Sequence, residues 1–414
     1  DAKHTKDAPR SIRPRRPEPG PLSPALDREA VVVVVVVVTA TADPLVLESR
    51  VESARDRFRF RTAEGVHSHD AFRTGELLAV EHLWDRDPGR LRVLEANYGV
   101  VGVVLAERAE TVQLVESSAR AAGLCEANAA ANGVDAGVEL AADYDSLAGG
   151  HDTAVYVPKP YTPLDLGCQR LVDALVGLRP GGQLYLAAHP RTGLSRFEER
   201  LSDHAAEMSR VATLDDWTLL RGSRPREVDR PTCVERRTRP ATVDGVTLSL
   251  VTAPGVFAAG GLDRGTRLLA ETADFDGESD VLDLCCGYGP LGTYAALAAG
   301  ADVWLTDDDA LATACAEATL DRNDARGRVR TADGVTAVAD RRFDHVVCNP
   351  PTHAGDGVLA ELLRGAADVL RPGGRLSLVH HRSLDLARFL DRFERVERVA
   401  RGREHVVLEA IAAT

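Results

Sequence analysis

Short apolar runs alternate with longer segments of helical periodicity through the second half of the chain. The runs lie at 281–284, 302–306, 327–331, 344–348 and 375–379, and the helical segments between them include 290–299 and 357–370. Short strands separated by helices are typical of βαβ units, which build a parallel, doubly wound sheet. In such a sheet, ligands bind at the carboxyl ends of the strands. The residues that follow each run are therefore the candidates for chemistry.

A glycine-rich turn follows the first of these strands. Gly287 and Gly289 allow the chain to turn tightly and to approach a ligand closely, and Gly292 lets the next helix pack on the strand. The second strand leads to Asp307, whose carboxylate could accept both hydroxyls of a ribose. Together the turn and the acid predict a nucleotide-binding βα unit.

Three further acids follow the second and third strands. Asp308 and Asp309 are expected to begin the next helix, as an N-cap and a first-turn acid that the helix dipole favours. Asp333 follows the third strand at the same sheet edge, where its side chain could receive the amino group of an adenine.

The tripeptide Asn349-Pro350-Pro351 ends the fourth strand. Each proline fixes φ at about −65° and lacks a backbone donor, and the residue before a proline avoids the α region. The strand therefore presents acceptors, namely the side-chain oxygen of Asn349 and the carbonyl of Pro350. Two such acceptors match an exocyclic NH₂ group and would orient its lone pair toward an electrophile. A proline-stiffened loop without chemistry is the alternative for the tripeptide alone.

These motifs resemble those of class I S-adenosylmethionine-dependent methyltransferases. That family carries Asp-x-x-x-Gly-x-Gly, an acid after the second strand and Asn-Pro-Pro after the fourth, and the first motif begins here at Asp283. The resemblance implies that S-adenosylmethionine is the cofactor. The cofactor-binding residues that it implies are Asp283, Gly287, Gly289, Asp307, Asp333 and Asn349.

A narrower resemblance covers residues 250 to 414. The segment from Pro254 to Leu269, called the leading segment below, is similar to one in the guanine-N2 methyltransferases of small-subunit ribosomal RNA. In that family this segment closes over the cofactor. The resemblance implies that Asn349, Pro350 and Pro351 hold the guanine amine and are the catalytic residues.

One position departs from that family. An aromatic residue usually follows the second proline and stacks on the target base, whereas this chain has Thr352 and then His353. Base stacking on an aromatic side chain contributes roughly 1–3 kcal/mol. His353 or Phe257 is therefore expected to bind the base, or the substrate differs from that of the family; a polar loop residue is the alternative for His353.

The first half of the chain repeats this plan at a shift of about 190 positions. Tyr98 to Gly102 match Tyr288 to Gly292, Leu178 to Leu184 match Leu370 to Leu376, and Glu116 falls where Asp307 does. Yet Asn97 replaces the first turn glycine, and Val157-Pro158-Lys159 replaces the Asn-Pro-Pro tripeptide. Val157 has no side-chain acceptor for an amine. This copy is expected to be inactive and to bind substrate or act as a scaffold; support of the second copy alone is the alternative.

The expected fold class is therefore α/β, with tandem duplicated Rossmann-like methyltransferase domains, each a doubly wound and mostly parallel sheet. A length of 414 residues accommodates two domains of about 150 residues and additional segments. The expected layout is a disordered tail rich in proline and arginine over 1–30, a degenerate domain over 31–220, an arginine-rich linker over 221–245, and a catalytic domain over 246–414.

The charge bears on the substrate. A formal net charge of −13 at pH 7 opposes nonspecific binding to a polyanion. Arginine supplies nearly all the positive charge, and several arginines crowd the predicted linker, where they could bind phosphates bidentately: Arg221, Arg224, Arg226, Arg230, Arg236, Arg237 and Arg239. A solvated linker is the alternative, because Glu227 and Asp229 lie among them. An acidic, lysine-poor composition is also typical of proteins from a high-salt cytoplasm.

Several other features limit the class of protein. Val31 to Val38 is an apolar run too short to span a bilayer and lacks a signal-peptide cleavage site, so we expect a buried strand that opens the first domain, and no membrane partner. The seven cysteines form no Cys-x-x-Cys pair and no zinc-like spacing with histidine. We therefore expect no metal site, and reduced thiols in a cytoplasmic protein.

The predicted function is methyl transfer to the exocyclic amine of a guanine in ribosomal RNA, either free or in a ribosomal subunit, by a monomeric enzyme. An adenine amine or a protein glutamine amide could fill the same acceptors. A non-catalytic RNA-binding factor for ribosome assembly is the alternative from a different class. The intact Asn349-Pro350 pair favours the enzyme.

Overall fold

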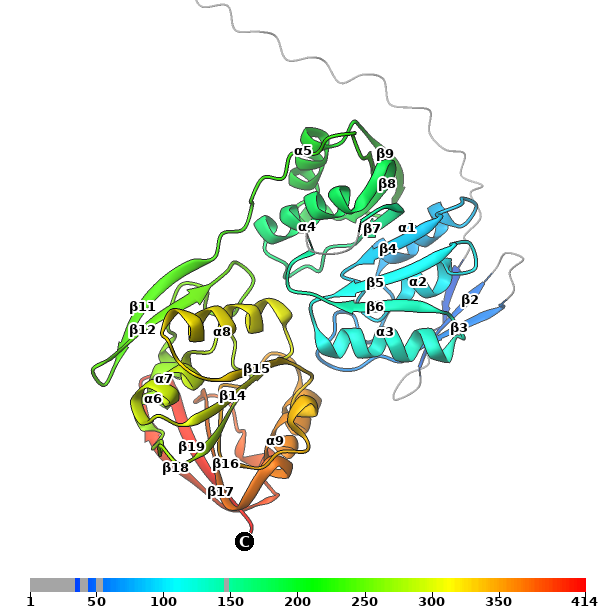
Figure 1. Cartoon of the computed structure of the whole chain (residues 1–414). Coiled ribbons are helices and arrows are strands. Elements are labelled where there is room, and N and C mark those ends of the chain that lie inside the picture. The colour runs from blue at the N-terminus through cyan, green and yellow to red at the C-terminus, as the bar shows by residue number, and fades with distance from the viewer. Residues whose placement is uncertain (1–33, 38–43, 50–54, 145–148) are drawn as a thin grey trace, which may run out of the picture.

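The computed structural model describes residues 34–37, 44–49, 55–144 and 149–414. These residues form two lobes that an extended segment joins (Figure 1). The predicted disordered tail over 1–30 lies outside the described residues.

Each lobe contains a seven-stranded sheet, and both sheets have the same strand order. That order is β6-β5-β4-β7-β8-β10-β9 in the first lobe and β15-β14-β13-β16-β17-β19-β18 in the second. In both sheets the first five strands in this order run parallel to one another. The sixth strand, β10 or β19, is antiparallel to both of its neighbours. The predicted duplication and the predicted fold class are confirmed.

The first sheet consists of β4 (Arg90–Leu94), β5 (Thr111–Glu116), β6 (Ala136–Leu140), β7 (His151–Tyr156), β8 (Leu178–Ala188), β9 (Glu207–Leu214) and β10 (Trp217–Ser223). The second consists of β13 (Asp280–Leu284), β14 (Asp302–Asp307), β15 (Arg328–Thr331), β16 (Phe343–Cys348), β17 (Leu370–His381), β18 (Phe393–Arg401) and β19 (His405–Ala412). The helices of the first lobe are α1 (Thr74–Leu83), α2 (Val100–Leu105), α3 (Ala119–Ala131), α4 (Leu164–Gly177) and α5 (Leu194–His204). Those of the second are α6 (Arg264–Thr272), α7 (Pro290–Ala299), α8 (Ala310–Arg322) and α9 (Asp356–Val369).

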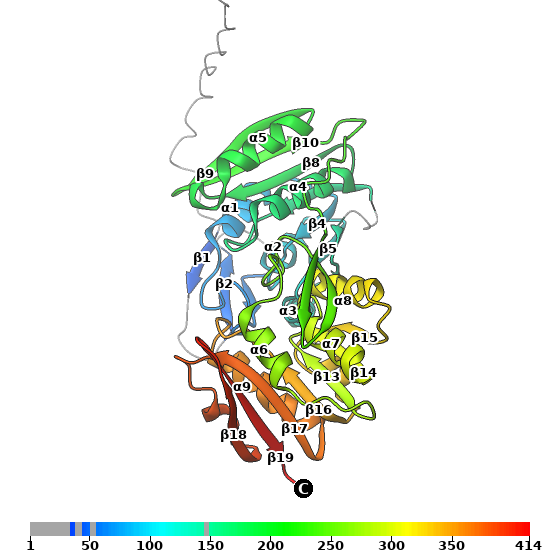
Figure 2. The same ribbon diagram turned by 90° about the vertical axis from the view of Figure 1, so that its left-hand side faces the viewer.

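Both faces of each central sheet are buried. Successive residues of a strand point to opposite faces, and in β13 Val281 and Leu282 belong to two different apolar clusters. In β4 of the first lobe, Val93 and Leu94 are divided in the same way. The continuous apolar runs of the sequence reflect this burial on both faces, which is typical of parallel sheets covered by helices. Figure 2 shows the helices around the two sheets from the side.

The structure adds detail to two predicted segments. The valine run forms β1 (Val34–Val37), which pairs antiparallel with β2 (Leu45–Ser49) in a small sheet completed by β3 (Arg57–Phe60), separate from the main sheet. The side chains of β1 lie outside the described residues. The predicted linker over 221–245 includes the end of β10 and all of β11 (Arg237–Val243), which forms a hairpin with β12 (Val246–Thr252). The exposed Arg237 and the half-buried Arg239 obscured the alternating pattern of β11.

The turns after β5 and β14 meet between the lobes. The Ala119 amide donates to the Asp308 carbonyl at 2.9 Å, and the Ala310 amide donates to the Ser117 carbonyl at 2.8 Å. The same shift in sequence relates Ser117 to Asp308 and Ala119 to Ala310. Equivalent atoms of the two copies therefore contact one another reciprocally, as in the two-fold interface of a homodimer.

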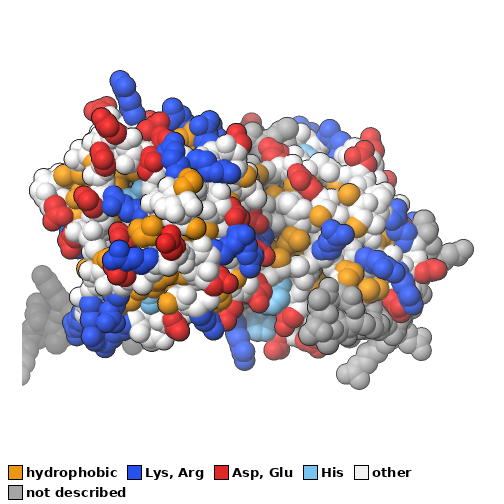
Figure 3. Space-filling view, turned by 90° about the horizontal axis from the view of Figure 1, so that it is seen from below, with side chains coloured by type: hydrophobic (Ala, Val, Ile, Leu, Met, Phe, Trp, Pro, Cys, Tyr) orange, Lys and Arg blue, Asp and Glu red, His pale blue; other side chains and the backbone are white. Residues whose placement is uncertain are grey.

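Charge is distributed without a large region of one sign on the face that Figure 3 shows, where acidic and basic side chains intermix. Among the described residues, no helix is long and apolar enough to cross a bilayer. The same part of the chain contains no group of three or more metal-ligating side chains.

Candidate active site

The glycine-rich turn between β13 and α7 has the backbone that its sequence predicts. Gly287 and Gly289 have φ values of 56° and 79°, in the left-handed region that glycine adopts without strain. Asp283 Oδ2 accepts a hydrogen bond from the Gly292 amide at 2.8 Å and so ties the strand to the helix. A Cβ atom added at Gly287 would meet nothing within 4 Å, so this side of the turn is open to a ligand.

Asp283 also has an unused acceptor. The side chain is fully buried, and its Oδ1 atom has no hydrogen-bond partner in the described structure. Burial raises the pKa of Asp283 to about 7. A buried carboxyl oxygen without a partner is costly, and a ligand donor at this turn would satisfy it.

Asp307 lies at the end of β14, directly beside the turn. Its Oδ2 atom accepts from the Gly287 amide at 2.8 Å, and its Oδ1 atom accepts from the Asp309 amide at 3.0 Å. These bonds fix the orientation of the carboxylate and leave each oxygen a further lone pair. Burial raises the pKa of Asp307 to about 7. The open turn and these two acidic groups fit the nucleoside and amino-acid parts of S-adenosylmethionine.

Asn349 lies directly after β16, at the same edge of the sheet. Its amide Nδ2 donates to Thr266 Oγ1 in α6 at 2.9 Å, which leaves Oδ1 available as an acceptor. Thr266 is fixed in turn because Asp263, the N-cap of α6, accepts hydrogen bonds from the amides of Gly265 and Thr266. Neither periodicity nor motif spacing predicted this role of Thr266, which lies 83 residues from Asn349 along the chain.

The other residues predicted around the substrate lie in a short turn and in the leading segment. Pro350 is buried, and the Pro351 carbonyl accepts from the Ala354 amide at 2.9 Å. His353 is exposed, and Phe257 has 63% of its surface exposed. Among the described residues, neither ring makes a stacking contact with another aromatic ring. Their role in binding a base stays a prediction.

The acids around Asp307 contact different partners. Asp309 is the N-cap of α8 and accepts from the Leu311 amide at 3.0 Å, so one of the two acids predicted to begin this helix does so. The prediction that Asp308 also begins this helix is wrong, because α8 starts at Ala310. The Asp308 carboxylate instead faces the N-terminus of α3 in the first lobe, where it accepts from Ser118 Oγ at 2.6 Å and from the Arg120 amide at 2.7 Å.

Asp333 follows β15 and also contacts the first lobe. Its Oδ1 atom accepts from Arg120 Nε at 3.2 Å. Burial raises the pKa of Asp333, and the positive charge of Arg120 opposes this rise. The sequence predicted that Asp333 lies at the ligand edge, but it did not predict this contact with the other copy.

The first lobe keeps the same turn with different side chains. Asn97 has a φ of 60°, close to that of Gly287, and its backbone amide donates to Glu116 Oε1 at 2.5 Å. Lys159 Nζ donates to Glu116 Oε2 at 2.9 Å. Both charged groups are buried, and although burial lowers the pKa of Lys159, the charge of Glu116 raises it above its ordinary value. An internal cation therefore contacts the acid that corresponds to Asp307.

Further internal contacts occupy the same edge of the first lobe. Arg170 forms a buried ion pair with Glu95, and Arg73 Nη1 donates to the Val157 carbonyl at 2.9 Å. Val157 stands where Asn349 stands in the second lobe. The acceptors of the first lobe are thus bound by its own arginine and lysine side chains.

A doubly wound sheet, an open glycine-rich turn and acids after two successive strands define the second lobe as an S-adenosylmethionine-dependent methyltransferase. The sequence model of the family described as "Methyltransferase small domain" matches residues 57–221 and again residues 247–409. The chain belongs to this family and contains its domain twice.

Named relatives agree with this assignment. The chain is 35% identical over 249 residues to a ribosomal RNA small subunit methyltransferase C of Pseudomonas paraeruginosa, a match that covers 58% of this chain and 72% of the relative. It is 27% identical over 276 residues to the protein of that name from Pseudoalteromonas atlantica, covering 64% and 78%. A solved 16S rRNA N2 methyltransferase of T. thermophilus, in complex with AdoMet and guanosine, has a TM-score of 0.72 at 24% identity and covers 94% of this chain and all of that one. At 24% identity, the likeness to this solved structure shows the fold alone.

Proposed function

We propose that this protein transfers a methyl group from S-adenosylmethionine to the exocyclic amine of a guanine in small-subunit ribosomal RNA. The observation that carries the proposal is the free Oδ1 acceptor of Asn349, which Thr266 fixes at the sheet edge shared with Asp307. The names of the curated relatives support ribosomal RNA as the substrate.

The second lobe supplies the cofactor site in this proposal. Asp307 binds the ribose hydroxyls, Gly287 and Gly289 let the backbone approach, and Asp283 receives a donor of the amino-acid part through its unpartnered oxygen. Asp333 accepts the adenine amine. When bound, the cofactor supplies an electrophilic methyl group on a sulfonium sulfur.

The substrate amine is bound by acceptors of this chain. Asn349 Oδ1 and the Pro350 carbonyl accept its two hydrogens and direct the nitrogen lone pair toward the methyl group. The amine nitrogen held by these two acceptors would receive the methyl group that the bound cofactor supplies, and the sulfonium sulfur would leave as a neutral thioether. The nitrogen then loses one proton to water, so that the reaction proceeds by positioning without a strong base. Phe257 or His353 stacks on the guanine.

The first lobe has no catalytic role in this proposal. The buried pair of Lys159 and Glu116 lies where a cofactor ribose would bind, and Val157 offers no side-chain acceptor. We further propose that the protein acts as a monomer in the cytoplasm, since the two copies already supply each other with a two-fold partner.

The test is transfer of labelled methyl groups to purified ribosomal subunits from cells that lack the enzyme, followed by nucleoside analysis of the digested RNA. The assay should be run over a range of salt concentrations because of the acidic composition. Labelled N2-methylguanosine in small-subunit RNA is the expected product. Label in methyladenosine or in protein would be consistent with the proposed mechanism but would show that guanine is not the substrate. Binding to RNA without any transfer of label would favour a non-catalytic factor for ribosome assembly.

A further inference from the structure

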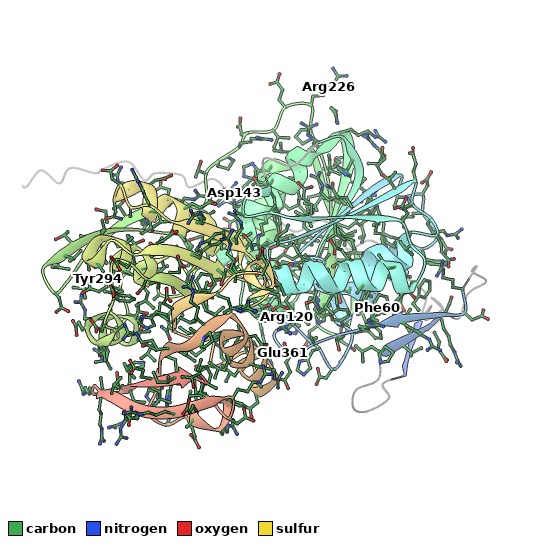
Figure 4. All side chains as sticks on the ribbon, turned by 60° about the horizontal axis from the view of Figure 1, so that its bottom comes forward. Phe60, Arg120, Asp143, Arg226, Tyr294 and Glu361 are labelled. Atoms are coloured by element: carbon green, nitrogen blue, oxygen red, sulfur yellow. The ribbon has the colours of Figure 1, made fainter. Side chains whose placement is uncertain are left out.

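Arg120 of the first lobe reaches into the second. It lies in the first turn of α3, and its side chain is only 12% exposed. Arg120 Nη2 lies 3.0 Å from Asp333 Oδ1 and 2.6 Å from Glu361 Oε2, so the guanidinium bridges two acids of the catalytic copy. Figure 4 shows Arg120 and Glu361 close together where α3 meets α9.

A cavity between the lobes adjoins this contact. Its volume is about 540 Å³, and both copies line it, with Ala63, Gly123 and Leu124 on one side and Thr331, Ala332 and Asp333 on the other. Thr331 is the register partner of Asp307 in the parallel pair of β14 and β15, and the Ala332 amide donates to the Asp307 carbonyl at 2.8 Å. The cavity therefore begins beside the proposed ribose acid, on the side toward Asp333.

The two oxygens of Asp333 are not equivalent. Oδ1 accepts from Arg120 Nε and is also near Nη2, whereas no hydrogen bond or ion pair involves Oδ2 in the described part of the chain. Arginine does not lose its proton in proteins, so its charge stabilises the ionised form of the carboxyl group. An ionised Asp333 fixed through one oxygen offers the other as an acceptor, which is what an adenine amine requires.

We propose that Arg120 is a positioning residue for the cofactor, and that through it the non-catalytic copy completes the adenine side of the catalytic copy's site. Arg120 orients Asp333 from across the lobe interface so that Oδ2 accepts the adenine 6-amino group. The inference rests on the proposed function, since it takes S-adenosylmethionine as the ligand of this edge.

The test is calorimetric titration of the full chain with two compounds, S-adenosylmethionine and an analogue whose purine lacks the 6-amino group. Arg120→Ala should weaken binding of S-adenosylmethionine about tenfold, the loss of roughly one charge-assisted hydrogen bond. Binding of the analogue should change less than about twofold, because the contact that Arg120 supports is already absent. Arg120→Lys keeps the charge but lacks the planar fork, and should give an intermediate loss.

Two controls separate this role from general loosening of the interface. Arg236→Gln removes an arginine that pairs with Asp143 of the first lobe at 2.9 Å without touching Asp333, and should leave both affinities unchanged. Thermal unfolding of each variant verifies that both lobes remain folded, and Arg120→Lys replaces Arg120→Ala in the comparison if the latter unfolds.

Each other outcome is decisive. Equal weakening of both compounds by Arg120→Ala, or no weakening of either, would overturn the role of Arg120 while the proposed methyltransferase function stands. Failure of the unsubstituted chain to bind S-adenosylmethionine would overturn the proposed function itself, and this inference with it.

Discussion

The two copies have the same strand order and nearly the same turn, but they differ in what occupies the carboxyl edge of the sheet. In the second copy, Asp307 and Asn349 contact local donors and keep acceptors free. In the first, Lys159 and Arg170 neutralise Glu116 and Glu95 within the protein. The comparison teaches that a few side chains at one edge decide whether this fold has a ligand site.

The turn persists where the ligand site does not. Glu95 and Cys285 occupy corresponding positions with φ values of 49° and 61°, both unusual for residues other than glycine. The bond from the Asn97 amide to Glu116 preserves the contact between the turn and the acid in the first copy. The backbone of the site is thus stabilised by its own hydrogen bonds, independently of catalysis.

The largest contrast between the copies should appear at Asn349 and its counterpart Val157. Asn349→Ala should lower the rate of methyl transfer by about 10²–10³-fold, because it removes a preorganised acceptor, and this loss should exceed any loss of cofactor affinity. The measurements are single-turnover transfer to ribosomal subunits and calorimetric cofactor binding. Val157→Ala, the mirror substitution, should retain transfer and cost about 2 kcal/mol of stability. Comparable losses of transfer in both variants would contradict the assignment of catalysis to one copy.

The next largest difference between the copies should concern the buried ion pair of Lys159 and Glu116 in the first copy. Lys159→Met leaves Glu116 buried without its cation, and should reduce the free energy of unfolding by about 3 kcal/mol, as measured by urea denaturation. The double substitution Lys159→Met with Glu116→Gln should recover most of that loss. In the second copy, Asp307→Asn should weaken cofactor binding without a comparable loss of stability. If Lys159→Met left the free energy of unfolding unchanged, the ion pair would not stabilise the first lobe.

The pH dependence of cofactor binding should be a smaller effect. Ribose hydroxyls donate to the ionised form of Asp307, whose pKa burial raises to about 7. Affinity should therefore fall as the pH drops below 7, by at most about tenfold per pH unit for this single ionisation. In the free protein the folded state binds this proton more tightly than the unfolded chain, so its contribution to stability decreases as the pH rises from about 4 to 7. Calorimetry from pH 5.5 to 8 tests the first statement, and Asp307→Asn should give a flatter profile.

The smallest effect concerns the turn itself. Gly287→Ala places a side chain at a φ of 56° and should cost about 1 kcal/mol of stability, whereas Gly287→Asn should cost less, because Asn97 already adopts this conformation. Urea denaturation of the two variants measures the difference. An alanine variant as stable as the asparagine variant would mean that backbone strain does not explain the glycine.

Local features of the site were predictable from the sequence, whereas contacts between the copies were not. The parallel strands, the turn glycines and the start of a helix near Asp309 follow from periodicity and from residues within a few positions of each other. Thr266, and the contacts of Arg120 and Asp308 across the lobes, join residues 83 to 213 positions apart. The valine run showed a strand but could not specify its partners, because an unbroken apolar run fits any buried sheet.

The reciprocal bonds between Ala119 and Asp308 and between Ala310 and Ser117 involve only main-chain atoms. Such bonds are indifferent to most substitutions, so either copy can accumulate change while the halves stay in register. Insertions or deletions are another matter, because a residue added to either of these turns would misalign both bonds at once. The two main-chain bonds therefore constrain the length of these turns more than their residue identities, whereas the side chains of Arg120 and Asp308 make contacts across the junction that the other copy does not mirror.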